Sequence, residues 1–150
     1  MESVYKKVLL DHFHNPRNRG DLDAMDVVRR GSNPRCGDDI EVGVSQNKRG
    51  ITSVRFRGRG CSICLASASM MSECTTNLGY RQTQQLVEQI LLWFSENNGK
   101  SPANTTLASL GAVRQHSARQ KCVLLPWQAL QEALIDINGK PDSRLAHSAR

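Results

Sequence analysis

The sequence predicts an α+β fold, in which helices pack on one face of a small antiparallel β-sheet. Apolar residues alternate with polar ones between residues 39 and 57, whereas the segments on both sides repeat their apolar residues at helical spacing. One helix, a small sheet and then more helices is an order typical of α+β domains. The 150 residues suffice for one hydrophobic core, so we expect a single domain over residues 1–139 and a flexible tail at residues 140–150.

The first expected element is an amphipathic helix near the amino terminus. Val4, Val8, Leu9 and Phe13 recur at helical spacing, and the dipeptide Asn15-Pro16 ends the pattern. The next segment, residues 17–32, has no clear period, and we expect it to form a long loop.

Two strands follow and form a hairpin. A short polar turn at residues 46–50 separates them, as expected for antiparallel neighbours with one apolar face. The apolar positions of the two strands alternate with polar or small residues, and they are Ile40, Val42, Val44, Thr52, Val54 and Phe56.

The second half of the chain predicts helices. Ser62 is a suitable N-cap for a helix that runs to about Asn77, which puts Cys61 beside the positive end of the helix dipole. Such a position stabilises a thiolate. A further helix is expected around residues 86–94, and a short helical piece around residues 107–115.

The third cysteine motif is expected near the start of the last helical segment. Ser117 and Gln120 have the form of a capping box, which predicts a helix start just before Cys122. Pro126 is expected to kink or restart the helix, because proline cannot donate a backbone hydrogen bond. The final apolar stripe continues to Ile137, where Asn138-Gly139 ends it.

Composition excludes some classes of function. The net charge is +6, but the basic residues are scattered and match no nucleic-acid-reading module, so nucleic acid is an unlikely partner. No apolar run approaches the roughly 20 residues of a membrane span. The amino terminus lacks the pattern of a signal peptide, which predicts a cytoplasmic location. There, the five cysteines are expected to be thiols or metal ligands.

Three cysteine motifs and one carboxylate form the candidate site. Cys36 and Asp38 flank a glycine after Asn33-Pro34, Cys61 follows a glycine-rich turn, and Cys122 follows a basic segment. Three thiolates and one carboxylate are a ligand set that suits tetrahedral zinc or iron. The long spacings alone are a weak metal signal, and three unrelated buried cysteines are the alternative.

The order of these motifs resembles a known family. From about Tyr5 to Leu134 the chain is similar to the U-type iron–sulfur cluster assembly proteins, which comprise the NifU amino-terminal domain, IscU and SufU. The segments that carry the resemblance are Leu10-Asp11-His12-Phe13-His14-Asn15-Pro16-Arg17-Asn18-Arg19-Gly20, Asn33-Pro34-Arg35-Cys36-Gly37-Asp38, Phe56-Arg57-Gly58-Arg59-Gly60-Cys61-Ser62-Ile63, Ala66-Ser67-Ala68-Ser69-Met70-Met71 and Arg119-Gln120-Lys121-Cys122-Val123-Leu124.

The resemblance implies a SufE/NifU-like fold and a role in iron–sulfur cluster assembly. Two roles share one set of residues, Cys36, Asp38, Cys61 and Cys122. In a scaffold they hold a transient [2Fe–2S] or [4Fe–4S] cluster, and in a sulfurtransferase they hold zinc, which we expect in the isolated protein. The implied partners are a cysteine desulfurase, which donates persulfide sulfur, and apo iron–sulfur proteins, which accept the cluster.

The segment before the last cysteine resembles the SufU branch of the family. The Leu-Pro-Pro-Val-Lys segment and the adjacent His of the IscU branch are absent, and Arg119-Gln120-Lys121 stands there instead. The SufU resemblance points to Cys36 as the first sulfur acceptor, whereas the IscU branch would favour Cys122. The freedom of the backbone at Gly37 also favours Cys36.

Two other functions remain open from the residues. One is a structural zinc-binding module for protein interaction, against which Asp38 counts because structural zinc sites favour Cys and His. The weaker one is a CxxC thiol oxidoreductase, since Cys61 and Cys64 stand three residues apart. Cys74 is expected to be a small buried apolar residue, and His12 a packed, hydrogen-bonded residue rather than a ligand.

Overall fold

The computed structural model describes residues 2–95 and 99–139. The predicted tail at residues 140–150 lies outside the described residues. Within those residues, no helix combines the length and apolarity that a membrane span requires. The elements in chain order are α1 (Glu2–His14), β1 (Val27–Asn33), β2 (Asp38–Asn47), β3 (Gly50–Arg59), α2 (Ser62–Thr75), α3 (Tyr80–Ser95), α4 (Thr105–Ala108), the 3₁₀ helix η1 (Ser109–Val113) and α5 (Ser117–Asn138).

The sheet has three antiparallel strands in the order β1-β2-β3. The predicted hairpin is confirmed as β2 and β3, but the prediction of a loop over residues 17–32 is wrong, because its last part is β1. This edge strand pairs with β2 from Val27 opposite Val44 to Asn33 opposite Asp38. Val27 is the one buried residue of β1, so the sequence of this strand shows no alternation of apolar and polar residues.

A β-bulge changes which residues of β3 face the core. The pairing shifts between Ser45 and Gln46, so that Gln46 lies opposite Ile51. Ile51 is therefore buried, whereas Thr52 is only partly buried, and the prediction of Thr52 as a core position is wrong. An extra residue in one strand reverses the side on which the preceding side chains point.

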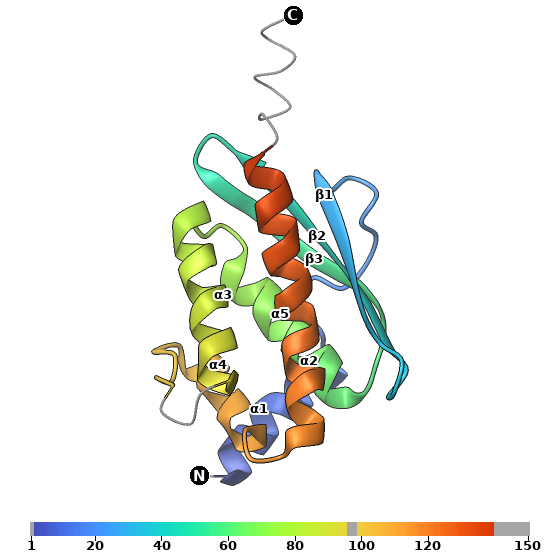
Figure 1. Ribbon diagram of the computed structural model, residues 1–150, viewed down its shortest axis with the longest axis vertical. Helices are drawn as coiled ribbons and strands as arrows, with labels where there is room; N and C mark the ends of the chain where they lie inside the picture. Colours follow the sequence, from blue (N-terminus) through green and yellow to red (C-terminus); the bar gives the residue numbers. More distant parts are fainter. Residues whose placement is uncertain (1, 96–98, 140–150) are drawn as a thin grey trace, which may run out of the picture.

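The helices gather on one face of the sheet, as predicted. In Figure 1, α5 runs along the sheet with α3 beside it, and α2 lies between them and the lower end of β3. Asn18 and Gly20 form backbone hydrogen bonds with Phe56 at the edge of β3, and Leu22 and Met25 lie against Gly43 on the other face of the sheet. This arrangement confirms the α+β prediction.

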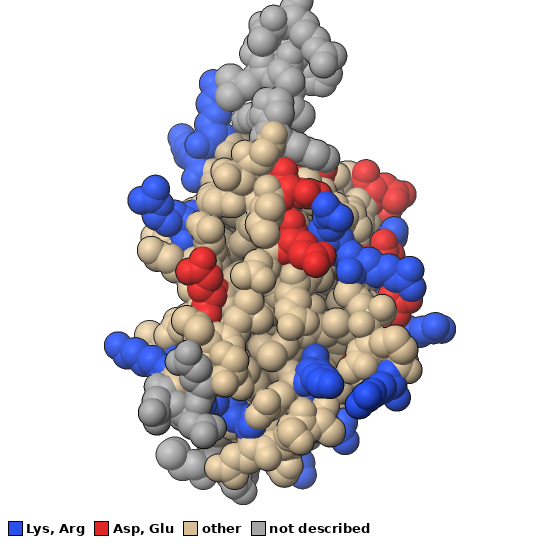
Figure 2. All heavy atoms as spheres, viewed as in Figure 1, with Lys and Arg blue, Asp and Glu red and all other residues tan. Residues whose placement is uncertain are grey.

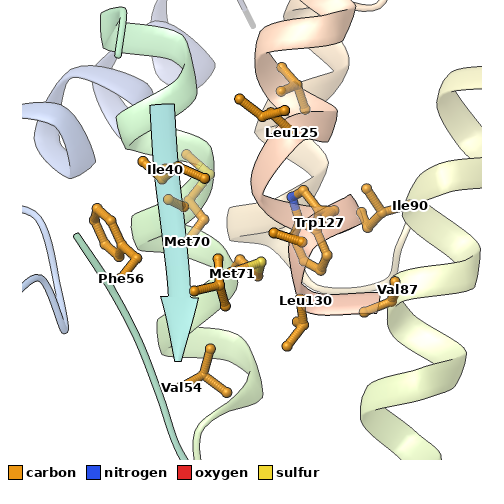
Figure 3. Packing of buried hydrophobic residues seen from close by; sticks show 14 of the residues in the cluster. Ile40, Val54, Phe56, Met70, Met71, Val87, Ile90, Leu125, Trp127 and Leu130 are labelled. Atoms are coloured by element: carbon orange, nitrogen blue, oxygen red, sulfur yellow. The ribbon is translucent and has the colours of Figure 1, made fainter. Parts of the chain in front are cut away.

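The core lies between the sheet and α2, α3 and α5. Figure 3 shows Met70 and Met71 of α2 between Phe56 on the sheet side and Trp127 on the α5 side. All four side chains are buried. Bulky apolar side chains from the sheet, α2 and α5 therefore fill the space between these layers.

Two predicted helix N-caps are wrong. Cys61, not Ser62, is the N-cap of α2, which ends at Thr75. The N-cap of α5 is His116, with no side-chain hydrogen bond, so Ser117 and Gln120 form no capping box. Gln120 instead donates to the carbonyl oxygen of Arg114.

A kink or a restart is predicted at Pro126, and the restart is absent. One continuous helix, α5, passes through this residue. Because Pro126 has no N–H, the carbonyl of Cys122 lacks its usual helical donor. Pro126 is buried in the core, and packing on both sides of the residue keeps the helix in one piece.

Candidate metal centre

Four separate parts of the chain meet at one end of the domain. They are the turn between β1 and β2, the start of β2, the link from β3 to α2, and the second turn of α5. A sulfur atom of Cys36, a carboxylate oxygen of Asp38 and the sulfur of Cys122 all lie within 4.8 Å of one another. Cys61 adjoins this group, since its sulfur is 4.0 Å from Oδ2 of Asp38.

Cys36 lies in the tight turn that joins β1 to β2. The carbonyl oxygen of Asn33 accepts hydrogen bonds from the backbone N–H groups of Cys36 at 3.2 Å and of Gly37 at 2.9 Å. Gly37 has a φ of 75°, a conformation that favours glycine, and open space surrounds its missing side chain. Cys36 is exposed. The turn therefore presents this thiol to solvent.

Asp38 is the buried carboxylate of the group. Only 1% of the residue is exposed, and its Oδ1 accepts a hydrogen bond from the backbone N–H of Cys61 at 2.8 Å. Gly60 permits this close approach, because a Cβ there would lie 3.0 Å from the same oxygen. Asp38 forms no ion pair with any residue that the structure describes.

The neighbouring Asp39 has a different role. Its carboxylate receives two hydrogen bonds from the guanidinium of Arg30, at 2.6 and 2.7 Å. This interaction lowers the pKa of Asp39. Successive residues of a strand point to opposite faces, so Asp38 faces the thiols and Asp39 faces the open side of the sheet.

Cys61 caps the amino terminus of α2. Its sulfur accepts a hydrogen bond from the backbone N–H of Cys64 at 3.5 Å, and its side chain is partly exposed. The prediction that this thiol lies beside the positive end of a helix is confirmed. The sulfur itself is the capping atom, at the positive end of the helix dipole.

Cys122 lies one turn inside α5 rather than at its start. Its sulfur is 3.8 Å from the carbonyl oxygen of Ala118, and the residue is only 3% exposed. Burial, followed by the neighbouring Cys61 and Asp38, raises the pKa of Cys122. Cys122 therefore does not share the N-cap position of Cys61.

A buried hydrogen-bond pair holds α5 against α2 next to Cys122. The hydroxyl of Ser67 donates to the carbonyl oxygen of Val123 at 2.7 Å and accepts from Nε1 of Trp127 at 3.0 Å. Ser67 and Trp127 are fully buried. Their role in positioning Cys122 is not visible in the sequence, because the two residues are 60 positions apart.

The remaining cysteines and His12 lie outside the ligand group. Cys64 is buried, and burial raises its pKa. Cys74 is partly buried, which raises its pKa to about 11. His12 is buried and its Nδ1 lies 2.8 Å from the hydroxyl of Ser69, so the interpretation of His12 as a packed residue is confirmed.

Exposed cations border the candidate site. Arg35, Arg59, Arg119 and Lys121 each stand within three residues of a site cysteine, and all four are exposed. Among residues 2–95 and 99–139, none of the four takes part in an ion pair. Their charges are therefore available to an approaching anion or acidic surface.

The chemistry of this donor set fits a metal cation. A carboxylate that is buried without a positively charged partner is costly unless a cation binds to it. Asp38 is such a group, and Cys36, Cys61 and Cys122 add three sulfur donors around it. Sulfur-rich sites with one oxygen suit zinc or iron rather than magnesium or calcium.

The chain is similar to several known proteins. A family model described as the NifU-like N terminal domain matches residues 4–143. The zinc-dependent sulfurtransferase SufU of Bacillus subtilis is 30% identical over 93% of this chain and 95% of its own length. The iron–sulfur cluster assembly scaffold protein IscU of Streptococcus pyogenes is 32% identical over 89% of this chain and 84% of its own.

A solved structure confirms the fold. The crystal structure of a putative iron–sulfur cluster assembly scaffold protein for the SUF system from Fervidobacterium islandicum aligns with a TM-score of 0.80. The alignment covers 89% of this chain and 98% of that protein, at 23% identity. At this identity the likeness concerns the fold alone.

Proposed function

The chain belongs to the family of NifU-like N-terminal domains, and on this basis we propose that it serves in iron–sulfur cluster assembly. The convergence of three thiols and a buried carboxylate at one end of the domain is the observation that carries the proposal. Two relatives are named as a zinc-dependent sulfurtransferase and as a cluster assembly scaffold. We consider these two forms of the role.

We propose Cys36, Asp38, Cys61 and Cys122 as the ligands. Bound zinc, which we expect in the isolated protein, supplies a positive charge that keeps ligating thiols deprotonated. That charge also offsets the burial of Asp38. A [2Fe–2S] or [4Fe–4S] cluster is then the cargo, which the same residues hold until an apo iron–sulfur protein accepts it.

Cys36 is our candidate for the first sulfur acceptor. It is the most exposed of the site thiols and lies in a turn, so it can move without disturbing a helix. Its thiolate attacks the outer sulfur of a persulfide on the donor enzyme, and a new S–S bond forms at Cys36. The cysteine of the donor leaves as a thiolate. Cys122, the rival acceptor, is 3% exposed and lies within α5.

The sulfur donor that we propose is a cysteine desulfurase with an acidic docking surface. Figure 2 shows Lys and Arg side chains around the lower end of the molecule, where α5 begins, while Asp and Glu side chains gather higher up. The unpaired Arg35, Arg59, Arg119 and Lys121 border the thiols at this end. Such a surface attracts an acidic partner and orients it toward Cys36.

A purely structural zinc module is a weaker candidate. Structural sites are closed and rely on Cys and His. Here one ligand is a carboxylate and another, Cys36, is exposed to solvent. A cytoplasmic location, as the sequence predicts, suits five free thiols.

The test is a single-turnover sulfur transfer. Zinc-loaded protein is mixed with a cysteine desulfurase and free cysteine, and the persulfide is located by peptide mass spectrometry after alkylation. We expect the first label on Cys36, and Cys36→Ser should abolish it. Label that appears first on Cys122, with Cys36 unmodified, would overturn the assignment of the acceptor.

A control separates the acceptor from the function as a whole. Cys74→Ser removes a thiol outside the ligand group and should transfer sulfur like the wild type. Complete absence of persulfide on every cysteine of the wild type and of Cys74→Ser would instead contradict the proposed function.

A further inference from the structure

Two thiols stand together at the amino terminus of α2. Cys61 is the N-cap and has an extended backbone, and Cys64 lies in the first turn, with its N–H directed at the sulfur of Cys61. Side chains three residues apart on a helix are neighbours, with Cβ atoms about 5–6 Å apart. A disulfide needs Cβ atoms about 3.5–4.5 Å apart, so the extended N-cap has to move about 1–2 Å closer to Cys64 to bridge the two.

The thiol of Cys64 lies toward the amino-terminal end of α2, beside Gly60, and Cys64 belongs to the buried core. A Cβ placed on Gly60, the residue before Cys61, would lie 3.2 Å from the sulfur of Cys64. Helical side chains lean toward the amino terminus of their helix, which explains this direction. Oδ1 of Asp38 lies 3.0 Å from the same Cβ position on Gly60. The buried thiol of Cys64 is therefore close to the candidate ligand Asp38.

The two thiols differ in their exposure to solvent. Cys61 is partly exposed, whereas Cys64 is fully buried. A reagent from solvent therefore reaches Cys61 first, and Cys64 can react only with its neighbour. Cys74 lies ten residues further along the same helix, about 15 Å away, and cannot take this part.

We propose that Cys61 and Cys64 form a reversible disulfide that removes Cys61 from the ligand group. The oxidant is a low-molecular-weight disulfide such as oxidised glutathione. The Cys61 thiolate attacks it, which forms a mixed disulfide and releases one small thiol. Cys64 then loses its proton and attacks the sulfur of Cys61, and the second small thiol leaves. Two protein thiols are oxidised, and one small disulfide is reduced to two thiols.

The consequence concerns the candidate metal site. Without Cys61, the remaining donors are Cys36, Asp38 and Cys122, and one sulfur is lost from the proposed set of four. Disulfide formation itself requires only Cys61 and Cys64, so it does not depend on the proposed function. Oxidation would then release zinc and leave Cys36 and Cys122 as unligated thiols.

The experiment uses the whole chain, in zinc-free and zinc-loaded forms, over a range of glutathione redox ratios. Trypsin leaves Cys61, Cys64 and Cys74 on one peptide, residues 60–81, so the assay is run on Cys74→Ser as well as on the wild type. We expect this peptide to lose the mass of two hydrogens, and dithiothreitol to restore it. Fragmentation should locate the bond between Cys61 and Cys64.

The matched variant is Cys64→Ala, with Cys64→Ser as a second choice if the first folds poorly. Oxidation of this variant should stop at the mixed disulfide of glutathione with Cys61. Half-modification of Cys61 should need at least about tenfold more oxidised glutathione than in the protein that retains Cys64, because closure of the internal disulfide is intramolecular. Release of zinc to a chromogenic chelator should need the same increase in the concentration of oxidised glutathione. A Cys74→Ser protein that never forms the internal disulfide across the redox range would overturn the proposal.

Discussion

Oδ1 of Asp38 and the backbone N–H of Cys61 are joined by a hydrogen bond of 2.8 Å. The bond connects the first strand of the hairpin to the start of α2, and so fixes the carboxylate relative to the thiol that follows it. Because 1% of Asp38 is exposed, its charge has little solvent to stabilise it. The residue therefore both shapes the site and supplies its negative charge.

The two roles of Asp38 can be separated by substitution. Asp38→Asn keeps an oxygen that accepts from Cys61 but removes the charge, and we expect zinc affinity to fall by at least about tenfold. Asp38→Ala removes the acceptor as well and should bind zinc more weakly still. Competition with a chromogenic chelator measures both.

The control for this series is Asp39→Asn. That carboxylate pairs with Arg30 on the open side of the sheet, so its loss should change zinc affinity by less than about twofold. Wild-type zinc affinity in Asp38→Asn would show that the carboxylate is not a ligand.

The thiols should differ in their rates of alkylation. In zinc-free protein at about pH 7.5, we expect Cys36 to react at least about tenfold faster than Cys64, Cys74 or Cys122. Cys36 is exposed, whereas burial raises the pKa of Cys64 and Cys122, and that of Cys74 to about 11. Timed alkylation with mass spectrometry gives the rates, and equal rates for Cys36 and Cys74 would contradict the structure.

The fold was predictable where the sequence has a strong period. Alternation across β2 and β3 and helical spacing around Val87 and Ile90 correspond to buried faces. Strand β1 has no such signal, because Arg29 and Arg30 are exposed on an edge and only Val27 is buried. Its place is set by pairing with β2, which is a contact between distant segments rather than a local preference.

The sequence predicts which residues belong to the candidate site, but not how they are arranged. Asp38 and the three cysteines follow from their motifs, whereas the burial of Cys122 depends on how α5 packs against α2. The capping role of Cys61 does not follow from the sequence, because Ser, Thr, Asp and Asn are the preferred N-caps and Ser62 stands next to it. The closeness of Cys64 to the site depends on Gly60, where the chain passes without a side chain.

The bridge between α2 and α5 gives a stability prediction. Ser67→Ala leaves Nε1 of Trp127 and the carbonyl of Val123 without their buried partner, which should cost about 1–3 kcal/mol of unfolding free energy. Urea unfolding of zinc-free protein measures this loss of free energy. Ser62→Ala changes an exposed serine that does not cap α2 and should cost less than about 0.5 kcal/mol. Equal losses in the two variants would contradict the role of the bridge.

His12 should make the protein less stable in acid. Its burial, and next the charge of Arg17, lower the pKa of His12 below the ordinary value of 6.5, against a smaller opposing effect of Glu73. The unfolded chain then binds more protons just below pH 6.5, so stability is complete above this pH and falls as the pH drops toward the folded pKa.

The measurement is the urea midpoint of zinc-free protein at about pH 8 and about pH 5.5. We expect His12→Gln to lose less stability on acidification than the wild type. His14→Gln, at the exposed end of α1, serves as the matched control and should behave like the wild type. An unchanged acid sensitivity in His12→Gln would show that other groups cause it.

The basic border of the site predicts a salt-dependent encounter with the sulfur donor. The double substitution Arg119→Glu with Lys121→Glu reverses two exposed charges beside Cys122, and we expect it to slow persulfide transfer about tenfold at low salt. The wild-type rate should fall as salt rises and approach that of the variant, because screening removes the attraction that the variant already lacks.

The control reverses two charges at the far end of the sheet. Lys48 and Arg49 lie in the β2–β3 turn, next to the Asn47–Gly50 pair, whereas the site adjoins the Asn33–Asp38 pair at the other end. Lys48→Glu with Arg49→Glu has the same change in net charge and should transfer sulfur at nearly the wild-type rate. If both double variants slow transfer equally, net charge rather than the surface around the thiols guides the partner.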